Sequence, residues 1–289
     1  MELELDYKFV LIAMISVASV WPGIGQIDTT GMRTIIAKED TLKVLAHSIL
    51  YEDIAENRFA ACERFIRKLT ETLKVPNSFY YPFLEFQNIS ILYPPDSSFR
   101  VFTWQLEVSR GDYRYYGAIQ FASSDLKMVP LIDRSFQMEP MSEHSTTAKS
   151  WYGGVYYNIV PFIHKGVTHF LMFGYDSHTY SVRRKFMDVM RINNDYTVTF
   201  TPACIKIGDA LLGRFSVEFA AEATIRFNFD PEINLVVFDH LIESPQSGLP
   251  GPIPDGTYEA FSLKNGFWEH LPKLDIQAMA TPPKSGEKN

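Results

Sequence analysis

Apolar residues recur along the chain with two different periods, and the change from one period to the other falls at Pro76. From residue 40 to residue 73, apolar positions are three or four residues apart, and charged side chains occupy the positions between them. This spacing predicts one broken amphipathic helix or two short helices, with Asp40 as the N-cap residue and Pro76 just beyond the end. After Pro76, apolar and polar residues alternate, as they do in strands with one buried face.

Alternating segments separated by turn residues predict a series of β-hairpins. The first hairpin joins strands 98–108 and 113–121 through four residues that include a glycine. Further strands are predicted at 155–163, 167–175, 185–192, 197–207, 214–219, 223–229, 235–241, 258–264 and 267–270. The last two flank Asn265-Gly266, which is the strongest of these turn signals.

Hairpins at this density, with no helical connections between them, predict antiparallel sheets, because parallel strands need a connection of a dozen or more residues each time. The expected fold class is therefore mainly β with an N-terminal helical segment, its antiparallel hairpins forming a sandwich or an irregular barrel. Two stretches interrupt the alternation. Residues 132–150 are expected to form a loop with a short helix, and the proline-rich residues 243–256 an extended crossing loop.

The apolar run from Phe9 to Trp21 predicts export. At thirteen residues it is shorter than the roughly 20 that cross a bilayer, and the small residues Gly23 and Gly25 favour cleavage before Gln26. The segment before the run differs from ordinary export signals, because it holds three acidic side chains and one lysine. A buried element of the mature fold and an uncleaved membrane anchor are the alternatives.

The expected organisation has four parts. Residues 1–25 form a signal peptide, residues 26–76 a helical N-terminal segment, residues 77–272 the antiparallel β domain and residues 273–289 a flexible tail. The expected location is periplasmic, outer-membrane-associated or secreted, with no transmembrane span after signal cleavage.

Composition narrows the classes of function. Apolar residues make up 46% of the chain and aromatic residues 14%, which indicates a folded core rather than a disordered chain. The net charge is −7 and no run of basic residues is present, so the chain lacks the positive surface that nucleic-acid binding requires. No nucleic-acid partner is therefore expected.

The two cysteines, Cys62 and Cys204, are too few for a disulfide framework. Cys62 lies in a series of apolar residues with helical spacing, which favours a buried thiol that packs as a small apolar group. Export would permit one bridge between the two cysteines, so the sequence leaves both states open.

Few residues carry the signs of catalytic chemistry. The seven histidines lack metal-ligand spacing, and neither a serine-nucleophile turn nor a phosphate-binding loop is present, so no metal or cofactor is expected. Asp176, Asp239 and His240 remain as candidates, because Asp239-His240 ends an apolar strand, where a carboxylate can orient a histidine as general base. A strand-end pair bonded to loop backbone is the alternative.

Aromatic side chains offer a second kind of candidate site. Trp104, Trp151 and Tyr152 would form a platform for a sugar ring if they were exposed on a sheet. Aromatic residues on neighbouring strands also pack against one another, which is the alternative interpretation.

Several turn and strand segments share a likeness to known proteins. The stretch WYGGVYYNIVPF at 151–162, with LMFGYD at 171–176, resembles a family of uncharacterised exported proteins of Gram-negative bacteria. Further matches lie at 218–223, 237–241 and 254–261, so the resemblance covers roughly the C-terminal half. It implies export and a shared β-rich fold, and it implies no particular activity.

These observations favour a noncatalytic binding or structural protein of the cell envelope, whose partner is another envelope protein or a glycan. The alternative is an exported hydrolase that acts on glycans or peptides through Asp176, Asp239 and His240.

Overall fold

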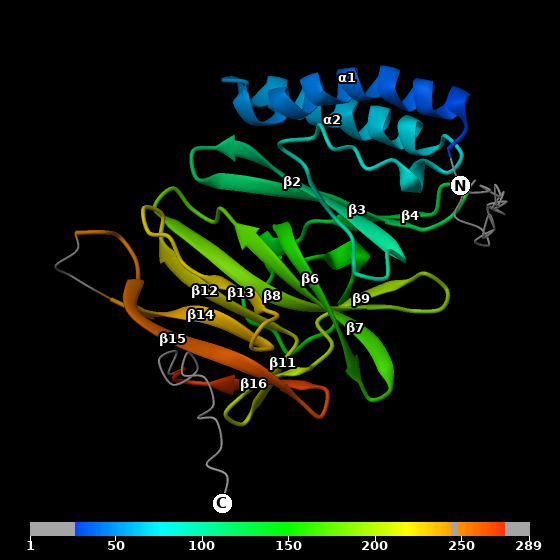
Figure 1. Ribbon diagram of the computed structural model, residues 1–289. Helices are drawn as coiled ribbons and strands as arrows, with labels where there is room; N and C mark the ends of the chain where they lie inside the picture. Colours follow the sequence, from blue (N-terminus) through cyan, green and yellow to red (C-terminus); the bar gives the residue numbers. More distant parts are fainter. Residues whose placement is uncertain (1–26, 244–247, 275–289) are drawn as a thin grey trace, which may run out of the picture.

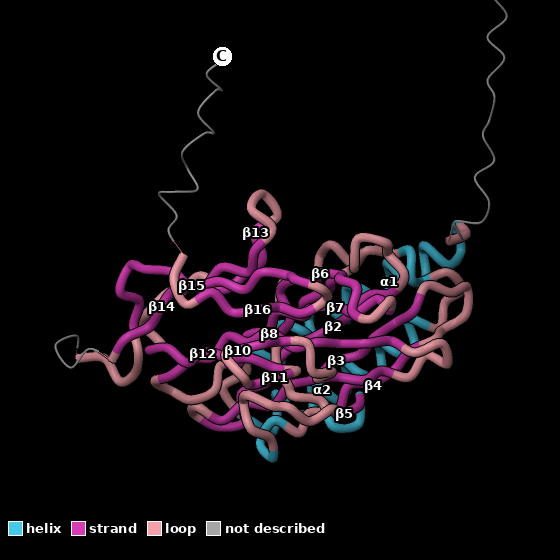
Figure 2. The backbone as a smooth tube through the Cα atoms, turned by 90° about the horizontal axis from the view of Figure 1, so that it is seen from below, coloured by secondary structure: helices cyan, strands magenta, loops and turns pink. Residues whose placement is uncertain are grey.

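A computed structural model describes residues 27–243 and 248–274 of the chain. The expected signal peptide and nearly all of the expected tail lie outside the described residues. The described part is built of four layers, with two helices covering the first of three stacked β-sheets (Figure 1). Viewed from below, the strands lie in front and the helices lie behind them (Figure 2).

The N-terminal helical segment is confirmed as two helices, α1 (Thr29–Tyr51) and α2 (Ala55–Leu73). The predicted N-cap at Asp40 is wrong. The side chain of Asp28 caps α1 by accepting a hydrogen bond of 2.6 Å from the amide of Gly31. Asp40 lies inside the helix on its exposed face, where a carboxylate stays hydrated and needs no capping role.

The first sheet lies directly beneath the helices. Its strands, in order, are β1 (Ser90–Leu92), β2 (Phe99–Ser109), β3 (Asp112–Phe121) and β4 (Met128–Ile132). The side chains of Phe102, Trp104 and Leu106 face the helices, where they form a core with residues such as Phe65. The intervening residues of β2, such as Val101, face the second sheet, so this sheet is covered on both sides.

The second sheet forms the middle layer of the β structure. It contains β5 (Thr146–Thr147), β9 (Val198–Phe200), β8 (Val182–Ile192), β7 (Val167–Asp176) and β6 (Val155–His164) in that order, and β12 (Arg214–Ala220) pairs with β8. Met172 and Phe186 face the first sheet, whereas Phe173 and Met187 face the third. The central strands β7 and β8 are therefore buried on both faces.

The third sheet closes the stack on the side away from the helices. Its strands, in order, are β11 (Ala210–Leu212), β10 (Ile205–Ile207), β16 (Phe267–Leu271), β15 (Ile253–Lys264), β14 (Leu235–Ile242) and β13 (Phe227–Asp230). Only the β10–β16 pairing is parallel among the strands described. The stacked sheets confirm the mainly β fold with antiparallel hairpins, and they are not closed into a barrel.

Three details of the strand prediction are wrong. The single strand predicted at 197–207 is two strands in different sheets, because Thr201 adopts a left-handed conformation with φ of 58° and Pro202 follows it. The stretch 253–256, expected in a crossing loop, already belongs to β15. Strands β1, β4, β5 and β11 were not predicted, because short segments show too few alternations to be recognised.

Both cysteines are free and buried. Burial raises the pKa of each thiol to about 11, so both are protonated at neutral pH. The indole nitrogen of Trp104 lies 3.4 Å from Cys62 Sγ, at the contact between α2 and the first sheet. The structure therefore agrees with the buried-thiol interpretation rather than with a bridge.

Two glycines make room for the ring of Phe186 in the core between the first and second sheets. A Cβ atom at Gly174 would lie 2.2 Å from Phe186 Cζ, and one at Gly154 would lie 2.6 Å from the same ring. The Gly153-Gly154 pair that follows Trp151-Tyr152 thus serves close packing.

Replacing Gly174 by alanine is expected to lower the free energy of unfolding by about 1–3 kcal/mol, because the added methyl group overpacks a filled core. Urea unfolding measures the loss. Combining Gly174→Ala with Phe186→Leu should restore part of the stability, since the smaller side chain vacates the space. Purely additive losses in this double-mutant cycle would contradict the explanation.

Candidate functional site

Strand β12 is an edge of the second sheet, and part of its backbone is unpaired. It pairs with β8 on one side. On the other side, Arg214 makes backbone hydrogen bonds of 3.3 and 3.4 Å with Ser142, and the amide of Ala220 donates one of 2.9 Å to Pro252. These two contacts close the ends of the outer edge.

The backbone groups of Ser216 and Glu218 lie between these closed ends. Because hydrogen-bonding directions alternate along an antiparallel strand, the residues of β12 that bond to β8 are the odd-numbered ones, and Ser216 and Glu218 direct their N–H and C=O groups outward. Within residues 27–243 and 248–274, these four groups have no hydrogen-bond partner.

A hollow of about 330 Å³ runs along this open edge, and we call it the edge groove. Its lining residues are Met141, Phe215, Ser216, Val217, Glu218, Phe238, Asp239, Leu241, Glu259 and His270. Four consecutive residues of β12 form one wall, and residues of β14, β15 and β16 form the other side. The groove therefore lies between the edge of the second sheet and the third sheet, where β12 approaches β14 (Figure 1).

The groove carries negative charge. Glu218, Asp239 and Glu259 line it, and none of its ten lining residues is lysine or arginine. Asp239 accepts a hydrogen bond from the backbone amide of Arg226, and among the described side chains it has no ion-pair partner. Glu259 bonds to His270, and its other carboxylate oxygen lies 3.9 Å from His240 Nε2. A cationic group that entered the groove would therefore meet the carboxylates of Asp239, which interacts electrostatically with Lys185, and of Glu259, which is paired with histidine.

Asp176, the first catalytic candidate, belongs to a buried polar cluster next to the groove. Its carboxylate accepts hydrogen bonds of 2.7 Å from the Tyr115 hydroxyl and the His178 amide, and one of 2.8 Å from Arg184 Nη1. Arg184 also binds Glu218, so the cluster reaches the groove wall. Burial, with a further contribution from Arg184, lowers the pKa of His178. Asp176 is thus held by three hydrogen-bond donors and in turn holds Arg184 in place.

The other two catalytic candidates have different partners. Asp239 lines the edge groove. His240, the next residue, has its side chain 39% exposed and contacts Asp255 through Nδ1 at 2.9 Å. No hydrogen bond among the described residues joins any two of Asp176, Asp239 and His240. His240 Nε2 also lies 3.9 Å from Glu259 Oε1, and Glu259 lines the groove together with Asp239, whereas Asp176 belongs to the separate cluster around Arg184.

The three candidate sugar-binding aromatics are core residues. Trp104, Trp151 and Tyr152 are 3%, 0% and 1% exposed. The Trp151 indole donates a hydrogen bond of 2.7 Å to the Tyr156 hydroxyl, and the hydroxyl of Tyr152 bonds to Arg184. These rings pack between sheets, and a sugar platform would need other side chains.

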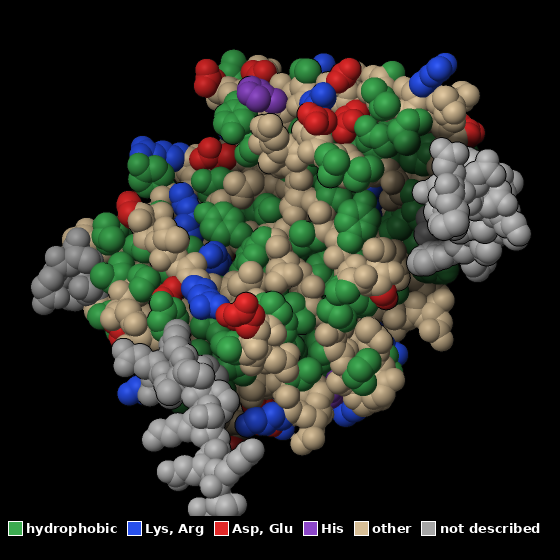
Figure 3. Space-filling model, viewed as in Figure 1, with side chains coloured by type: hydrophobic (Ala, Val, Ile, Leu, Met, Phe, Trp, Pro, Cys, Tyr) green, Lys and Arg blue, Asp and Glu red, His purple; other side chains and the backbone are tan. Residues whose placement is uncertain are grey.

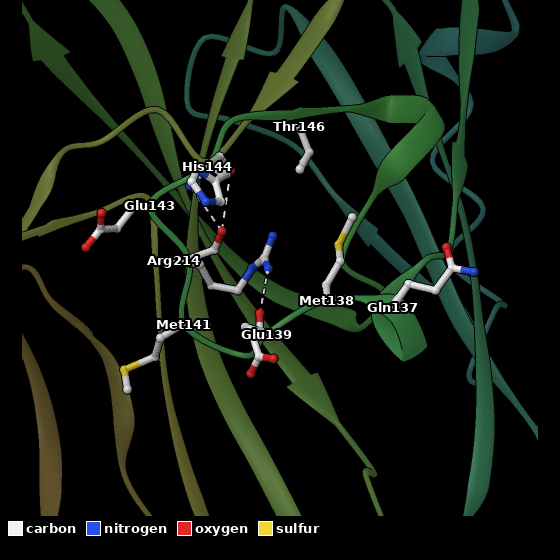
Figure 4. A pocket seen from close by; sticks show the side chains of 9 residues that line it. Gln137, Met138, Glu139, Met141, Glu143, His144, Thr146 and Arg214 are labelled. Carbon is white, nitrogen blue, oxygen red and sulfur yellow. Dashed lines mark hydrogen bonds between the residues drawn. The ribbon is translucent and has the colours of Figure 1, made fainter.

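A second hollow, of about 420 Å³, lies on the other side of the segment 137–146 (Figure 4). Arg214 points toward it, and Met141 borders both hollows. Arg214 Nη2 lies 3.1 Å from Asp188 Oδ2, and Nη1 donates to the Glu139 carbonyl at 3.4 Å. Because Asp188 neutralises this arginine, the second hollow offers no free positive charge to an anion.

Surface charge alone does not single out a site. On the face seen in Figure 3, apolar side chains are mixed with charges of both signs. Within the described ranges, no three His, Cys, Asp or Glu side chains are grouped so as to hold a metal ion. The edge groove is distinguished instead by unpaired backbone groups of β12 beside the carboxylates of Asp239 and Glu259.

Sequence reasoning missed Glu218, Glu259 and His270. No motif connects these residues, but one signal was present for two of them. The Asn265-Gly266 turn sets the register of β15 against β16, which pairs Ala260 with Leu271 and so brings Glu259 near His270. Glu218 has no such signal, because its position depends on how two sheets pack.

Comparison of the chain with protein-family models, with curated proteins and with solved structures gives no match. The resemblance to exported proteins of Gram-negative bacteria stays a prediction. Neither described helix is long and apolar enough to cross a membrane.

Proposed function

We propose that this chain is a noncatalytic binding protein of the cell envelope, exported from the cytoplasm, which holds another envelope protein in the edge groove. The observation that carries the proposal is the open stretch of β12 at Ser216 and Glu218. Edge strands with unpaired groups are natural templates for pairing with another chain, and many proteins protect such edges. Here the open edge lies beside a groove.

The state of the candidate acid and base groups supports a noncatalytic role. General acid–base catalysis needs a titratable group within about 3 Å of the reacting atom and free to exchange a proton. Asp176 is hydrogen-bonded to Tyr115, His178 and Arg184, and no hydrogen bond among the described residues joins Asp239 to His240. The apolar run at 9–21, with its small residues before Gln26, supports export.

Capture experiments with two arginine variants test this function. The full chain, tagged and produced in its own cell, should retain one specific protein from the envelope fraction. Leu241→Arg, which places a bulky cation in the groove, is expected to reduce capture about tenfold or more. The matched control is Ile242→Arg, because Ile242 is 40% exposed, does not line the groove and receives the same charge.

Equal capture by the two arginine variants would exclude the groove as the binding site, and the absence of any specific partner would contradict the function. Both variants should first show the thermal midpoint of the parent protein within a few degrees. The hydrolase alternative is tested on the same samples. Turnover of glycan or peptide substrates that Asp239→Asn abolishes would establish catalysis instead.

A further inference from the structure

We infer that the partner enters the edge groove as a short extended segment, adds an antiparallel strand to β12, and places a lysine or arginine side chain beside Asp239 and Glu259. This inference rests on the proposed function and specifies the chemistry of the partner. Backbone hydrogen bonds would supply the pairing, and the carboxylates would select the side chain.

The backbone of β12 defines the length and direction of the added strand. Ser216 and Glu218 offer two donors and two acceptors, which is the set that two residues of an antiparallel strand satisfy. Ser142 and Pro252 already occupy the ends of the edge. The segment that pairs is therefore about four residues long, or roughly 13 Å of extended chain. The antiparallel direction continues the pairing of every other strand in the second sheet.

The alternation of side chains places the basic residue. Phe215 and Val217 direct their side chains toward the core shared with the third sheet. A residue of the added strand opposite Val217 has its side chain on the same face, which is the side where Asp239 and Glu259 lie. Its own N–H points away from β12, whereas the N–H groups of its two neighbours point toward Ser216 and Glu218.

Charge complementarity identifies the class of side chain. Asp239 is only 9% exposed and forms no ion pair within 4 Å in the described part of the chain, although Lys185, the residue of β8 opposite Val217, interacts with it electrostatically from farther away. A largely buried carboxylate gains most from a charge-assisted hydrogen bond with an ammonium or guanidinium group. An acidic side chain at the same place would be repelled by the carboxylates of Asp239 and Glu259. The groove therefore selects a basic segment over an acidic one.

A library of displayed random eight-residue peptides, selected against the full chain, tests the preference. Enriched peptides should carry one lysine or arginine flanked by β-branched or aromatic residues. Asp239→Asn, which keeps the oxygen that accepts from the Arg226 amide, should weaken the best peptide about tenfold. Glu232→Gln is the matched control, because this substitution also removes one negative charge, and Glu232 is exposed and lies outside the groove.

Backbone methylation of the selected peptide tests strand addition itself. N-methylation of either neighbour of the basic residue should weaken binding tenfold or more, because each methyl group removes a donor to β12. N-methylation of the basic residue should change the dissociation constant less than twofold. On the protein side, Ser216→Pro removes one outward donor and should weaken binding, whereas Ser216→Ala keeps the donor and should not.

Several results would overturn the inference. They are failure to enrich basic peptides, equal sensitivity to methylation at all three positions, sensitivity at the basic residue alone, and a concentration-dependent dimer in which β12 of a second copy fills the groove. The proposed function survives these results if Leu241→Arg still loses the envelope partner and Ile242→Arg does not. If neither variant loses the partner, the proposed function itself fails.

Discussion

Replacing Arg214 by methionine is expected to lower the free energy of unfolding by about 3–5 kcal/mol at neutral pH. Arg214 is 1% exposed and forms an ion pair with Asp188, which is 0% exposed. Methionine fills much of the same volume but leaves the Asp188 carboxylate buried without its cation. Urea unfolding at pH 7 measures the loss.

The dependence of this loss on pH provides a second test. Burial raises the pKa of Asp188, and Arg214 opposes the rise. Without the arginine, the folded-state pKa should rise further above the unfolded value, so folding is favoured where Asp188 is protonated and disfavoured as pH rises through the folded-state pKa. The deficit of Arg214→Met should therefore shrink as pH falls from 7 toward 4.

A double-mutant cycle separates the charge effect from lost packing. Arg214 also lies over the ring of Tyr152, 4.1 Å from its centroid, so some of the loss comes from that contact. Adding Asp188→Asn to Arg214→Met removes the unpaired charge and should recover more than 1 kcal/mol at pH 7. A loss that is the same at pH 4 and pH 7, with no recovery in the double variant, would contradict the buried-charge explanation.

Replacing Arg100 by methionine is expected to cost about 3 kcal/mol or more, because several buried acceptors lose their donor at once. Arg100 is 0% exposed and forms no ion pair among the described residues. It donates instead to Gln120 Oε1 and the Tyr93 hydroxyl at 2.8 Å, and to the carbonyls of Ser78 and Tyr81. These bonds fasten the connection between the helices and the first sheet onto β2.

Arg100→Lys is the informative companion to this variant. Lysine keeps the charge but lacks the planar set of five donors, and it stacks less well between aromatic rings. The guanidinium carbon lies 5.1 and 4.8 Å from the ring centroids of Phe83 and Phe102. We expect an intermediate loss, with faster amide exchange in residues 78–93. A lysine variant as stable as the parent would show that charge alone is needed.

Local patterns in the sequence predict most of the secondary structure and little of the site. Turn residues predict the hairpins correctly, because a short turn determines which strands pair and in what register. The start of α1 is missed, although Met32, Ile35 and Ile36 have helical spacing, because Gly31 disfavours a helix and Asp28 lacks a glutamate three residues later that would mark it as an N-cap. The split at Thr201 is missed, because a left-handed threonine has no sequence signature.

The order of the layers and the edge groove depend on contacts between distant segments. Alternation shows that Phe102 and Val101 lie on opposite faces of β2, but it does not show whether helices or strands cover each face. The groove requires that β12 remain an edge and that β14 pack beside it. Neither condition is encoded within a single strand, so Glu218 could not be associated with Asp239 before the sheets were placed.

Strands β7 and β8 have no face that meets water, since Phe173 and Met187 lie against one neighbouring sheet and Met172 and Phe186 against the other. Truncating the chain before β13 would remove β13, β14, β15 and β16 of the third sheet and leave apolar side chains of β7 and β8 in solvent. Such a fragment should aggregate or be degraded. The region from β1 to β16 must therefore fold as one cooperative unit. Attempts to express its halves separately should fail.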